Sequence, residues 1–268
     1  MITAQCLGFL NTPPLWEKEQ FGIQQFEFPN IDLHSFLPKP IPQNIRLGHQ
    51  MEYVFKQLVA YSEIYEVVLH NLPVRQDKIT LGEIDFILRD KTNDQLIHVE
   101  LTYKFYIINP EISKPIQQLV GPNRRDMFVA KVEKIKNNQF PLLHSKEGVK
   151  SLVSNNINHS SIKHQCCFKA QLFLPYRRAS VDLHPLNNKC VVGYWLRHDT
   201  FNTPEFSKYQ YYIPRKSEWV IEPHHQFPYK SHSEIMPDIN LRLLKESAPL
   251  VWLKKSNTTF EKFFLVWW

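Results

Sequence analysis

Two short stretches decide the fold: GEIDFIL at residues 82–88 and IHVELTYKF at residues 97–105. Apolar and polar residues alternate in both, which predicts two β-strands that each have an apolar core face and a polar face. The expected core faces carry Ile84, Phe86, Leu88, Ile97, Val99, Leu101, Tyr103 and Phe105. The expected polar faces carry Glu83, Asp85, His98, Glu100, Thr102 and Lys104. A polar segment at residues 90–95 separates the strands, so we expect them to pair as an antiparallel hairpin.

The register of this hairpin places two acids together. If the connection turns about Thr92 and Asn93, Phe86 faces Val99 and Asp85 lies opposite Glu100. Carboxylates directly opposite on a sheet repel unless a cation, a proton or a basic side chain compensates. A hard divalent ion, Mg²⁺ or Mn²⁺, would do so, since it takes carboxylate, water and phosphate oxygens as ligands. The alternative interpretation is a solvated strand face with ordinary surface charges.

The order of these residues resembles a known nuclease core. Asp85, then Glu100, then a lysine just downstream, preceded by a helix that carries Glu52, is similar to the PD-(D/E)XK nucleases. The resemblance implies an α/β fold with a restriction-endonuclease-like core, a mixed sheet flanked by helices. It further implies that Asp85 and Glu100 are catalytic metal ligands, that Lys104 is the catalytic lysine, and that Glu52 is an accessory metal ligand. A bound Mg²⁺ or Mn²⁺ would serve phosphodiester hydrolysis in nucleic acid, with DNA the expected substrate.

A second resemblance extends over most of the chain. Several segments are similar to a bacterial family labelled domain of unknown function 1853. These segments are residues 47–49, 81–86, 98–100, 104–106 and 121–123.

One departure from the nuclease pattern bears on catalysis. The usual lysine stands two residues after the second acid, where this chain has Thr102, and Lys104 lies two residues further on, about 7 Å along a regular strand. Two alternatives to a nuclease therefore stay open. One is a nucleic-acid-binding module that has lost its chemistry, and the other is a protein-interaction scaffold.

Two helices are expected to flank the hairpin. Apolar residues recur at helical spacing from residue 47 to about residue 63, and Glu52 stands off this stripe, where it borders a site or meets water. A second helix is expected after the break at residues 121–122, with Asn123 as its N-cap. Its candidate phosphate contacts are Arg124, Arg125 and Lys131. A solvated amphipathic helix is the alternative interpretation.

Composition divides the chain into three regions of one domain. Residues 1–44 are rich in proline and aromatic residues and suit an extended arm packed on the core, residues 45–137 hold the nuclease-like core, and residues 138–268 form a strand-rich extension. The apolar end of the chain, residues 260–268, must be buried or partnered, so a homo-oligomer through this aromatic tail is one expectation.

The overall counts narrow the function classes. The 268 residues contain seven glycines, all isolated, against nineteen prolines, so neither a GxGxxG nor a P-loop motif is present. The net charge of +6 favours a polyanionic partner. The sequence contains no run of about eighteen consecutive apolar residues, so no membrane-spanning helix is predicted. The four cysteines are irregularly spaced, and Cys166 and Cys167 beside His159 and His164 match no common zinc pattern, so we expect buried thiols in a cytoplasmic protein.

Overall fold

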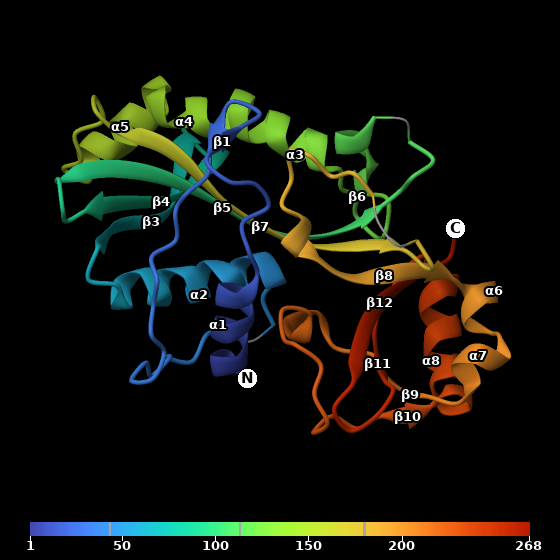
Figure 1. Ribbon diagram of the computed structural model, residues 1–268. Helices are drawn as coiled ribbons and strands as arrows, with labels where there is room; N and C mark the ends of the chain where they lie inside the picture. The colour runs from blue at the N-terminus through green and yellow to red at the C-terminus, as the bar shows by residue number, and fades with distance from the viewer. Residues whose placement is uncertain (43, 113, 179–180) are drawn as a thin grey trace.

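The computed structural model describes residues 1–42, 44–112, 114–178 and 181–268, and within them a ten-stranded mixed sheet has helices on both faces (Figure 1). The strand order is β10-β9-β11-β12-β8-β7-β5-β4-β3, and β6 pairs with β5 off this path. The strands are β3 (Tyr65–Gln76), β4 (Ile79–Asp90), β5 (Gln95–Ile108), β6 (Leu119–Val120), β7 (Lys163–Pro175), β8 (Val191–Arg197), β9 (Gln210–Tyr212), β10 (Lys230–Ser231), β11 (Leu250–Lys254) and β12 (Phe260–Val266). The predicted α/β class, with a mixed sheet flanked by helices, is confirmed.

The hairpin at the centre of the prediction is β4 and β5. They pair antiparallel from Asp90↔Gln95 to Phe86↔Val99, which confirms the predicted register up to that pair, while the predicted pair Asp85↔Glu100 lies just beyond the ladder. Beyond that pair the strands separate, because β4 stays with β3 while β5 continues alongside β7 in a parallel ladder. We call this point of separation, residues 84–86 of β4 with residues 99–101 of β5, the fork.

The regular alternation expected for β4 is wrong at Ile84. Phe86 packs against Phe55 of α2 (Leu47–Tyr61), with ring centroids 4.7 Å apart. Ile84 instead joins the cluster that contains Leu143, on the opposite face of the sheet. On the neighbouring strand β3, His70 pairs with Phe86 and Leu72 pairs with Ile84, so Asn71 lies between these two pairs. The φ of Asn71 is 50°, in the left-handed region, and this residue interrupts the pleat of β3. The strand therefore changes face at Asp85, and that residue is freed from the regular ladder.

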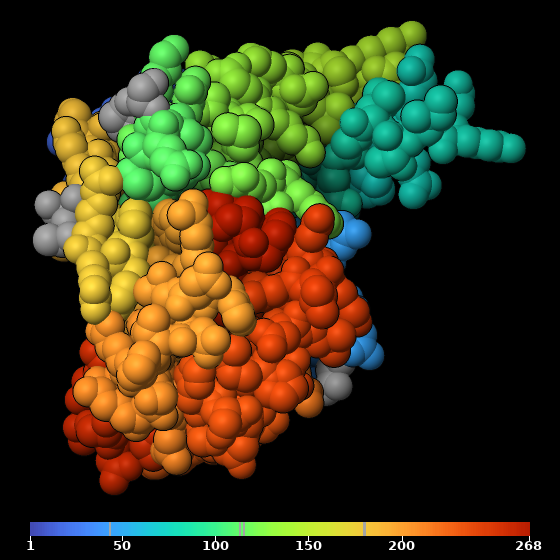
Figure 2. Space-filling model, turned by 90° about the vertical axis from the view of Figure 1, so that its right-hand side faces the viewer, coloured from blue at the N-terminus to red at the C-terminus, as the bar shows by residue number. Residues whose placement is uncertain are grey.

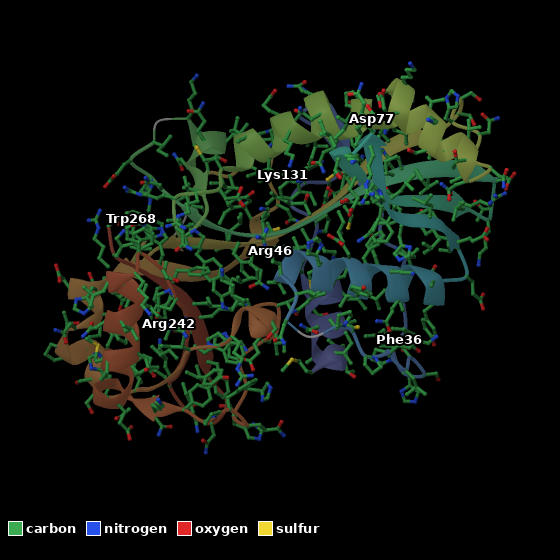
Figure 3. All side chains as sticks on the ribbon, turned by 180° about the vertical axis from the view of Figure 1, so that it is seen from behind. Phe36, Arg46, Asp77, Lys131, Arg242 and Trp268 are labelled. Atoms are coloured by element: carbon green, nitrogen blue, oxygen red, sulfur yellow. The ribbon has the colours of Figure 1, made fainter. Side chains whose placement is uncertain are left out.

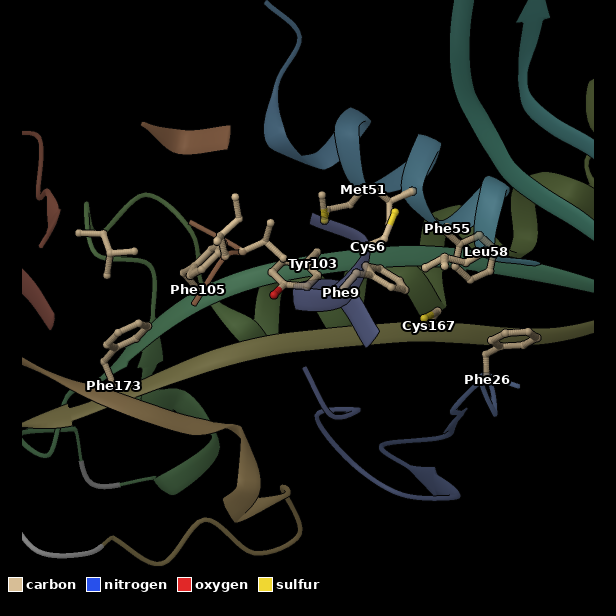
Figure 4. Close-up of a cluster of buried hydrophobic side chains, with 14 of the residues drawn as sticks. Cys6, Phe9, Phe26, Met51, Phe55, Leu58, Tyr103, Phe105, Cys167 and Phe173 are labelled. Atoms are coloured by element: carbon tan, nitrogen blue, oxygen red, sulfur yellow. The ribbon is translucent and has the colours of Figure 1, made fainter. Parts of the chain in front are cut away.

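Two helical layers cover this half of the sheet (Figure 1). α1 (Ile2–Asn11) and α2 lie on one face, and the other carries α3 (Phe128–Lys134), a π-helical turn (Ile135–Gln139), α4 (Phe140–His144) and α5 (Lys146–Ser154). The predicted stripe of α2 is confirmed as buried, although the helix ends at Tyr61. Figure 4 shows its side chains Met51, Phe55 and Leu58 meeting Phe9 of α1 over the sheet.

The expected start of the second helix is wrong. α3 begins at Phe128, because the preceding segment closes into a loop in which the Gly121 N–H donates to the Asp126 carbonyl oxygen at 2.6 Å. Asn123 caps nothing in α3, and its side chain accepts a hydrogen bond from the Ala248 N–H at 2.8 Å.

The first region is only in part an extended arm. α1 occupies residues 2–11, and a small hairpin follows, β1 (Glu19–Gln20) with β2 (Ile23–Gln24). Residues 25–42 then run largely without regular structure, with Phe26 buried in the core, while residue 43 of the predicted arm lies outside the described residues. The prediction of a helix-free arm missed α1, because the proline and aromatic residues that indicate an extended chain begin only after it.

The C-terminal half is strand-rich, as predicted. β7, β8 and β12 continue the parallel part of the sheet from β5, and α6 (His198–Phe201), α7 (Pro204–Ser207) and α8 (His232–Leu244) pack against it. The apolar tail forms β12 in the interior of the sheet, where residues 263–266 are completely buried. In Figure 2 the last residues (dark red) fill the space between the loop near residue 120 (green) and the orange C-terminal layer. The tail is therefore buried within its own chain.

All four cysteines are free and buried, which confirms the interpretation of Cys166 and Cys167 as buried thiols. None of the helices in the described part of the chain has both the length and the apolar character needed to cross a membrane.

Candidate functional site

The fork brings Asp85 and Glu100 together. Asp85 lies one step beyond the last hairpin pair, and its Oδ2 accepts a hydrogen bond from the Leu101 N–H at 2.9 Å, across the opening. Its carboxyl group lies close enough to that of Glu100 for the Glu100 charge to raise its pKa. Glu100 is completely buried, with 0% of its surface exposed, while Asp85 is partly exposed. The fork is therefore not the solvated face of the alternative interpretation.

Burial, and the charges of neighbouring groups, govern the ionisation of this pair. Burial raises the pKa of Glu100 to about 7, against the opposing effect of the nearby Lys131 charge. Burial, and then the Glu100 charge, raise the pKa of Asp85 well above its usual range. The pair thus needs a proton or a cation near neutral pH.

A row of three imidazoles leads from Glu100 to the surface. His98 Nε2 lies 3.0 Å from Glu100 Oε1, His98 Nδ1 lies 2.9 Å from His164 Nδ1, and His164 Nε2 lies 2.7 Å from His144 Nε2. Burial lowers the pKa of His98 to about 3 and that of His164 to about 4, so both rings are neutral at pH 7. Each neutral ring has one N–H, and all three contacts become hydrogen bonds when every ring donates toward Glu100.

Lys131 also belongs to this site. It projects from α3 into the space between the helical layer and the sheet (Figure 3), where its Nζ donates to Gln139 Oε1 at 2.8 Å. Gln139 Nε2 in turn donates to Glu100 Oε2. Burial lowers the pKa of Lys131, whereas its own charge lowers the pKa of both Asp85 and Glu100. Lys131, predicted as a phosphate contact, thus lies beside the two carboxyl groups.

The π-helical turn explains how two residues of one helix reach Glu100. In a regular α-helix, positions eight residues apart are offset by about 80° around the axis. The wider turn at Ile135–Gln139 reduces the offset between Lys131 and Gln139, so that both side chains face the sheet. Single π turns inside helices are frequent at functional sites.

Lys104 lies apart from the pair. Its ammonium forms an ion pair with Asp126, in the loop before α3. Thr102 occupies the usual position of the lysine, is buried, and has no hydrogen-bond partner for its hydroxyl group among the described residues. The displaced lysine of the sequence pattern therefore has a different partner.

Glu52 approaches the fork from α2, on the other side of the sheet. Both its carboxylate oxygens lie 3.1 Å from His49 Nδ1, and Asn71 Nδ2 donates to its Oε2 at 2.7 Å. Its charge raises the pKa of Asp85, as a lesser cause than burial and Glu100. Glu52 thus acts on Asp85 through its field, while its oxygens are held by His49 and Asn71.

The two predicted arginine contacts lie in the loop before α3. The Arg124 guanidinium stacks on the ring of Trp268, 3.7 Å from its centroid, and the Trp268 indole N–H donates to the Pro122 carbonyl oxygen. Arg124 therefore helps to hold Trp268 against this loop. Arg125 is exposed.

The donor set is small for a metal ion. No group of three or more His, Cys, Asp or Glu side chains in the described part of the chain is arranged to hold one. Mg²⁺ is commonly bound by one or two carboxylates, with waters and substrate phosphates completing its shell. Two neighbouring carboxyl groups with raised pKa values, Glu100 buried and Asp85 partly exposed, fit that minimal set.

Sequence reasoning missed His98, His144, His164 and Gln139 as a group around Glu100. One local signal existed, because His98 and Glu100 stand two residues apart on the polar face of one predicted strand. The other three reach them through the parallel pairing of β5 with β7 and through the π turn, which leave no trace in local sequence.

Comparison with known proteins adds one positive result. No curated protein and no solved structure matches the chain. A family model described as Domain of unknown function (DUF1853) matches residues 11–262, and the chain therefore belongs to that family.

Proposed function

We propose that the fork is the active site of a metal-dependent nuclease that hydrolyses phosphodiester bonds in nucleic acid, with DNA as its substrate. One observation carries the proposal: two carboxyl groups, Asp85 and Glu100, adjoin at an opening of the sheet, with the charge of Lys131 acting on both. Like charges placed together in a buried setting destabilise a fold unless the arrangement is used. A divalent cation bound by both would remove that repulsion.

Each residue of the fork has its own role in this proposal. Asp85 and Glu100 would hold Mg²⁺ or Mn²⁺, which when bound polarises a phosphoryl oxygen and lowers the pKa of a bound water. Lys131 stabilises the negative charge that develops on the phosphate. Gln139 and His98 hold Glu100 in one orientation from two sides. This assignment moves the lysine role from Lys104 to Lys131.

The exposure of the residues at the fork determines the side from which a substrate would approach. Glu100 is completely buried, whereas Asp85 and Lys131 are both partly exposed. A phosphodiester therefore meets the fork from the side of Asp85 and Lys131. The exposed Arg125 belongs to the loop that leads into the helix of Lys131, where it can contact a neighbouring phosphate.

One observation favours a second candidate, a nucleic-acid-binding module without turnover. Both oxygens of Glu100 already accept hydrogen bonds, from His98 and Gln139, and Lys104 is bound to Asp126. The two functions differ in a single property, cleavage.

A cleavage assay separates them. Duplex DNA, single-stranded DNA and RNA are incubated with the wild type in Mg²⁺, in Mn²⁺ and in EDTA, and then with Asp85→Asn, Lys131→Met and Lys150→Met. Lys150 is an exposed residue of α5 in the same helical layer and serves as the matched control. Metal-dependent cleavage that both fork variants lose and Lys150→Met keeps supports the nuclease. Salt-sensitive binding without cleavage selects the binding module, and cleavage in EDTA or by Asp85→Asn refutes the proposed site.

A further inference from the structure

A cavity of about 920 Å³ lies on the other face of the sheet from Glu100. It is open to solvent on one side and is bordered by α1, by the segment after it, and by the chain at residues 25–34, with β7 as its floor. Cavities of this size are typical of small-molecule sites. The parallel register of β5 and β7 fixes the side: Glu100 pairs with Cys166 on one face, and Leu101 and Tyr103 pair with Cys167 and Lys169 on the other.

Apolar side chains form the larger part of the cavity walls. These side chains belong to Leu10, Pro13, Phe26, Phe28, Ile31 and Leu33. Figure 4 shows Phe26 and Cys167 near each other at the floor. The charged side chains along the cavity, other than Lys169, are exposed ones such as Glu27 and Asp32. An apolar ligand therefore matches most of this surface.

Lys169 is the exception in this apolar setting. It is only 4% exposed, its ammonium donates to the Thr12 carbonyl oxygen, and it lies 4.9 Å from the ring centroid of Phe9 and 5.7 Å from that of Phe28. Within the described residues it forms no ion pair with an acid, and burial lowers its pKa. An ammonium has three donors, and one of them is used.

Another buried lysine of the sheet shows what a compensated charge looks like here. Lys262 on β12 is 3% exposed, and its Nζ donates to Glu222 Oε1 at 2.7 Å. Buried charges in proteins are normally paired in this way. Lys169 instead borders a cavity, since Phe28, which lies under its ammonium, is also a wall of that cavity.

We propose that this cavity binds an apolar carboxylate of the medium-chain fatty acid class, with the carboxylate on Lys169 and the hydrocarbon chain along the apolar walls. Lys169 is the only buried cation among the described residues that line the cavity, because Lys18, the other lysine there, is exposed. One buried cation among largely apolar walls suits one negative charge on an apolar body. The exposed acids Glu27 and Asp32 disfavour a polyanion such as nucleic acid. The site is independent of the nuclease proposal, because it uses other residues on the other face of the sheet.

The competing explanation is structural. Thr12 is the C-cap residue of α1, so the Lys169 ammonium also meets the carbonyl end of a helix, where a cation is favoured. If that were its whole role, the charge of a ligand head group would not affect binding.

Calorimetric titration of the full chain with decanoate and with decanol tests this difference. We expect saturable binding of one decanoate per chain and at least tenfold weaker binding of decanol, because a hydrogen bond to a charged group contributes about that much. Lys169→Met is expected to weaken decanoate binding at least tenfold and to leave decanol unchanged. Lys262→Met, which removes the other buried lysine, is expected to bind both ligands as the wild type does.

Three results would overturn the proposal: no saturable decanoate binding, equal affinity of the wild type for decanoate and decanol, or an unchanged decanoate affinity in Lys169→Met. The first two need only the wild-type protein, so they decide the question even if Lys169→Met fails to fold.

Discussion

Replacing Glu100 with glutamine should stabilise the folded protein above pH 7 and leave its stability unchanged near pH 4.5. In the folded protein the pKa of Glu100 is about 7, above its ordinary value of 4.5, so folding takes up a proton between these two pH values. The contribution of this group to stability is therefore greatest below pH 4.5, falls as the pH rises, and reaches its minimum above pH 7. The amide keeps the shape of the side chain without the charge.

The magnitude follows from the size of the pKa difference. About 2.5 pH units at 1.36 kcal/mol each correspond to roughly 3 kcal/mol. For a protein of this size that free energy raises the unfolding midpoint by roughly 6 to 12 °C. Removing the Glu100 charge also removes one of the causes that raise the pKa of Asp85, which adds to the gain.

The surroundings can accept the amide. Glu100 takes hydrogen bonds from two sides, and an amide has only one oxygen, so the new NH₂ group must donate to one neighbour. His98 can become that acceptor if its proton moves to Nδ1, and His164 and His144 can shift their protons in the same sense. The row of imidazoles then donates away from position 100, with every contact kept.

The assay is thermal or urea unfolding in EDTA from pH 4.5 to pH 8.5, for the wild type, Glu100→Gln and Glu63→Gln. Glu63 is exposed and controls for the loss of one surface carboxylate. The quantity compared is the difference in free energy of unfolding between each variant and the wild type. His98 and His164 have lowered pKa values and so favour the folded state as the pH rises toward 6.5, but they are present in all three proteins. A difference for Glu100→Gln that is flat with pH, or destabilising at pH 8, refutes the reasoning.

Three further predictions test the site and the fold. Mg²⁺ should raise the unfolding midpoint of the wild type at pH 8 but not that of Asp85→Asn, and equal shifts in thermal melts would contradict binding at the fork. In single-turnover cleavage, Lys131→Met should lower the rate about 100-fold or more. Lys104→Met should lower it less than about tenfold, because the Lys104 ammonium of the wild type is held by Asp126. The reverse order would restore Lys104 to the catalytic role. Gly193→Ala should lower the free energy of unfolding by about 2 kcal/mol or more, because the new Cβ would overlap the Lys262 carbonyl oxygen. The Cβ added by Gly48→Ala in α2 meets no atom within 4 Å, so this variant should be neutral or slightly stabilising. Similar urea midpoints for these two glycine variants would contradict the close pairing of β8 with β12.

The part of the fold that sequence predicts is the part set by local patterns. The alternation of β4 and β5, with a polar turn between them, fixes the pairing of Phe86 with Val99. The apolar stripe of α2 likewise fixes its buried face. These features depend on residues near one another in the chain.

The remainder depends on contacts between distant segments. The change of face at Ile84 goes with the left-handed residue Asn71 on the neighbouring strand. His164 reaches His98 only because β7 lies parallel to β5, and Lys131 turns inward on a helix whose start is set by the loop before it. The sequence therefore predicts that the two acids of the candidate site lie together and names Lys131 as a phosphate contact. It predicts neither the position of Lys131 beside these acids nor the hydrogen bonds around Glu100.

The measurement that tests the central claim most directly is the rate of duplex DNA cleavage after Mg²⁺ is added to a chelated mixture of DNA and excess protein. We expect cleavage by the wild type to begin with the metal, to stop when EDTA is restored, and to be absent in Asp85→Asn. Cleavage that proceeds without the metal, or at the same rate in Asp85→Asn, would contradict it.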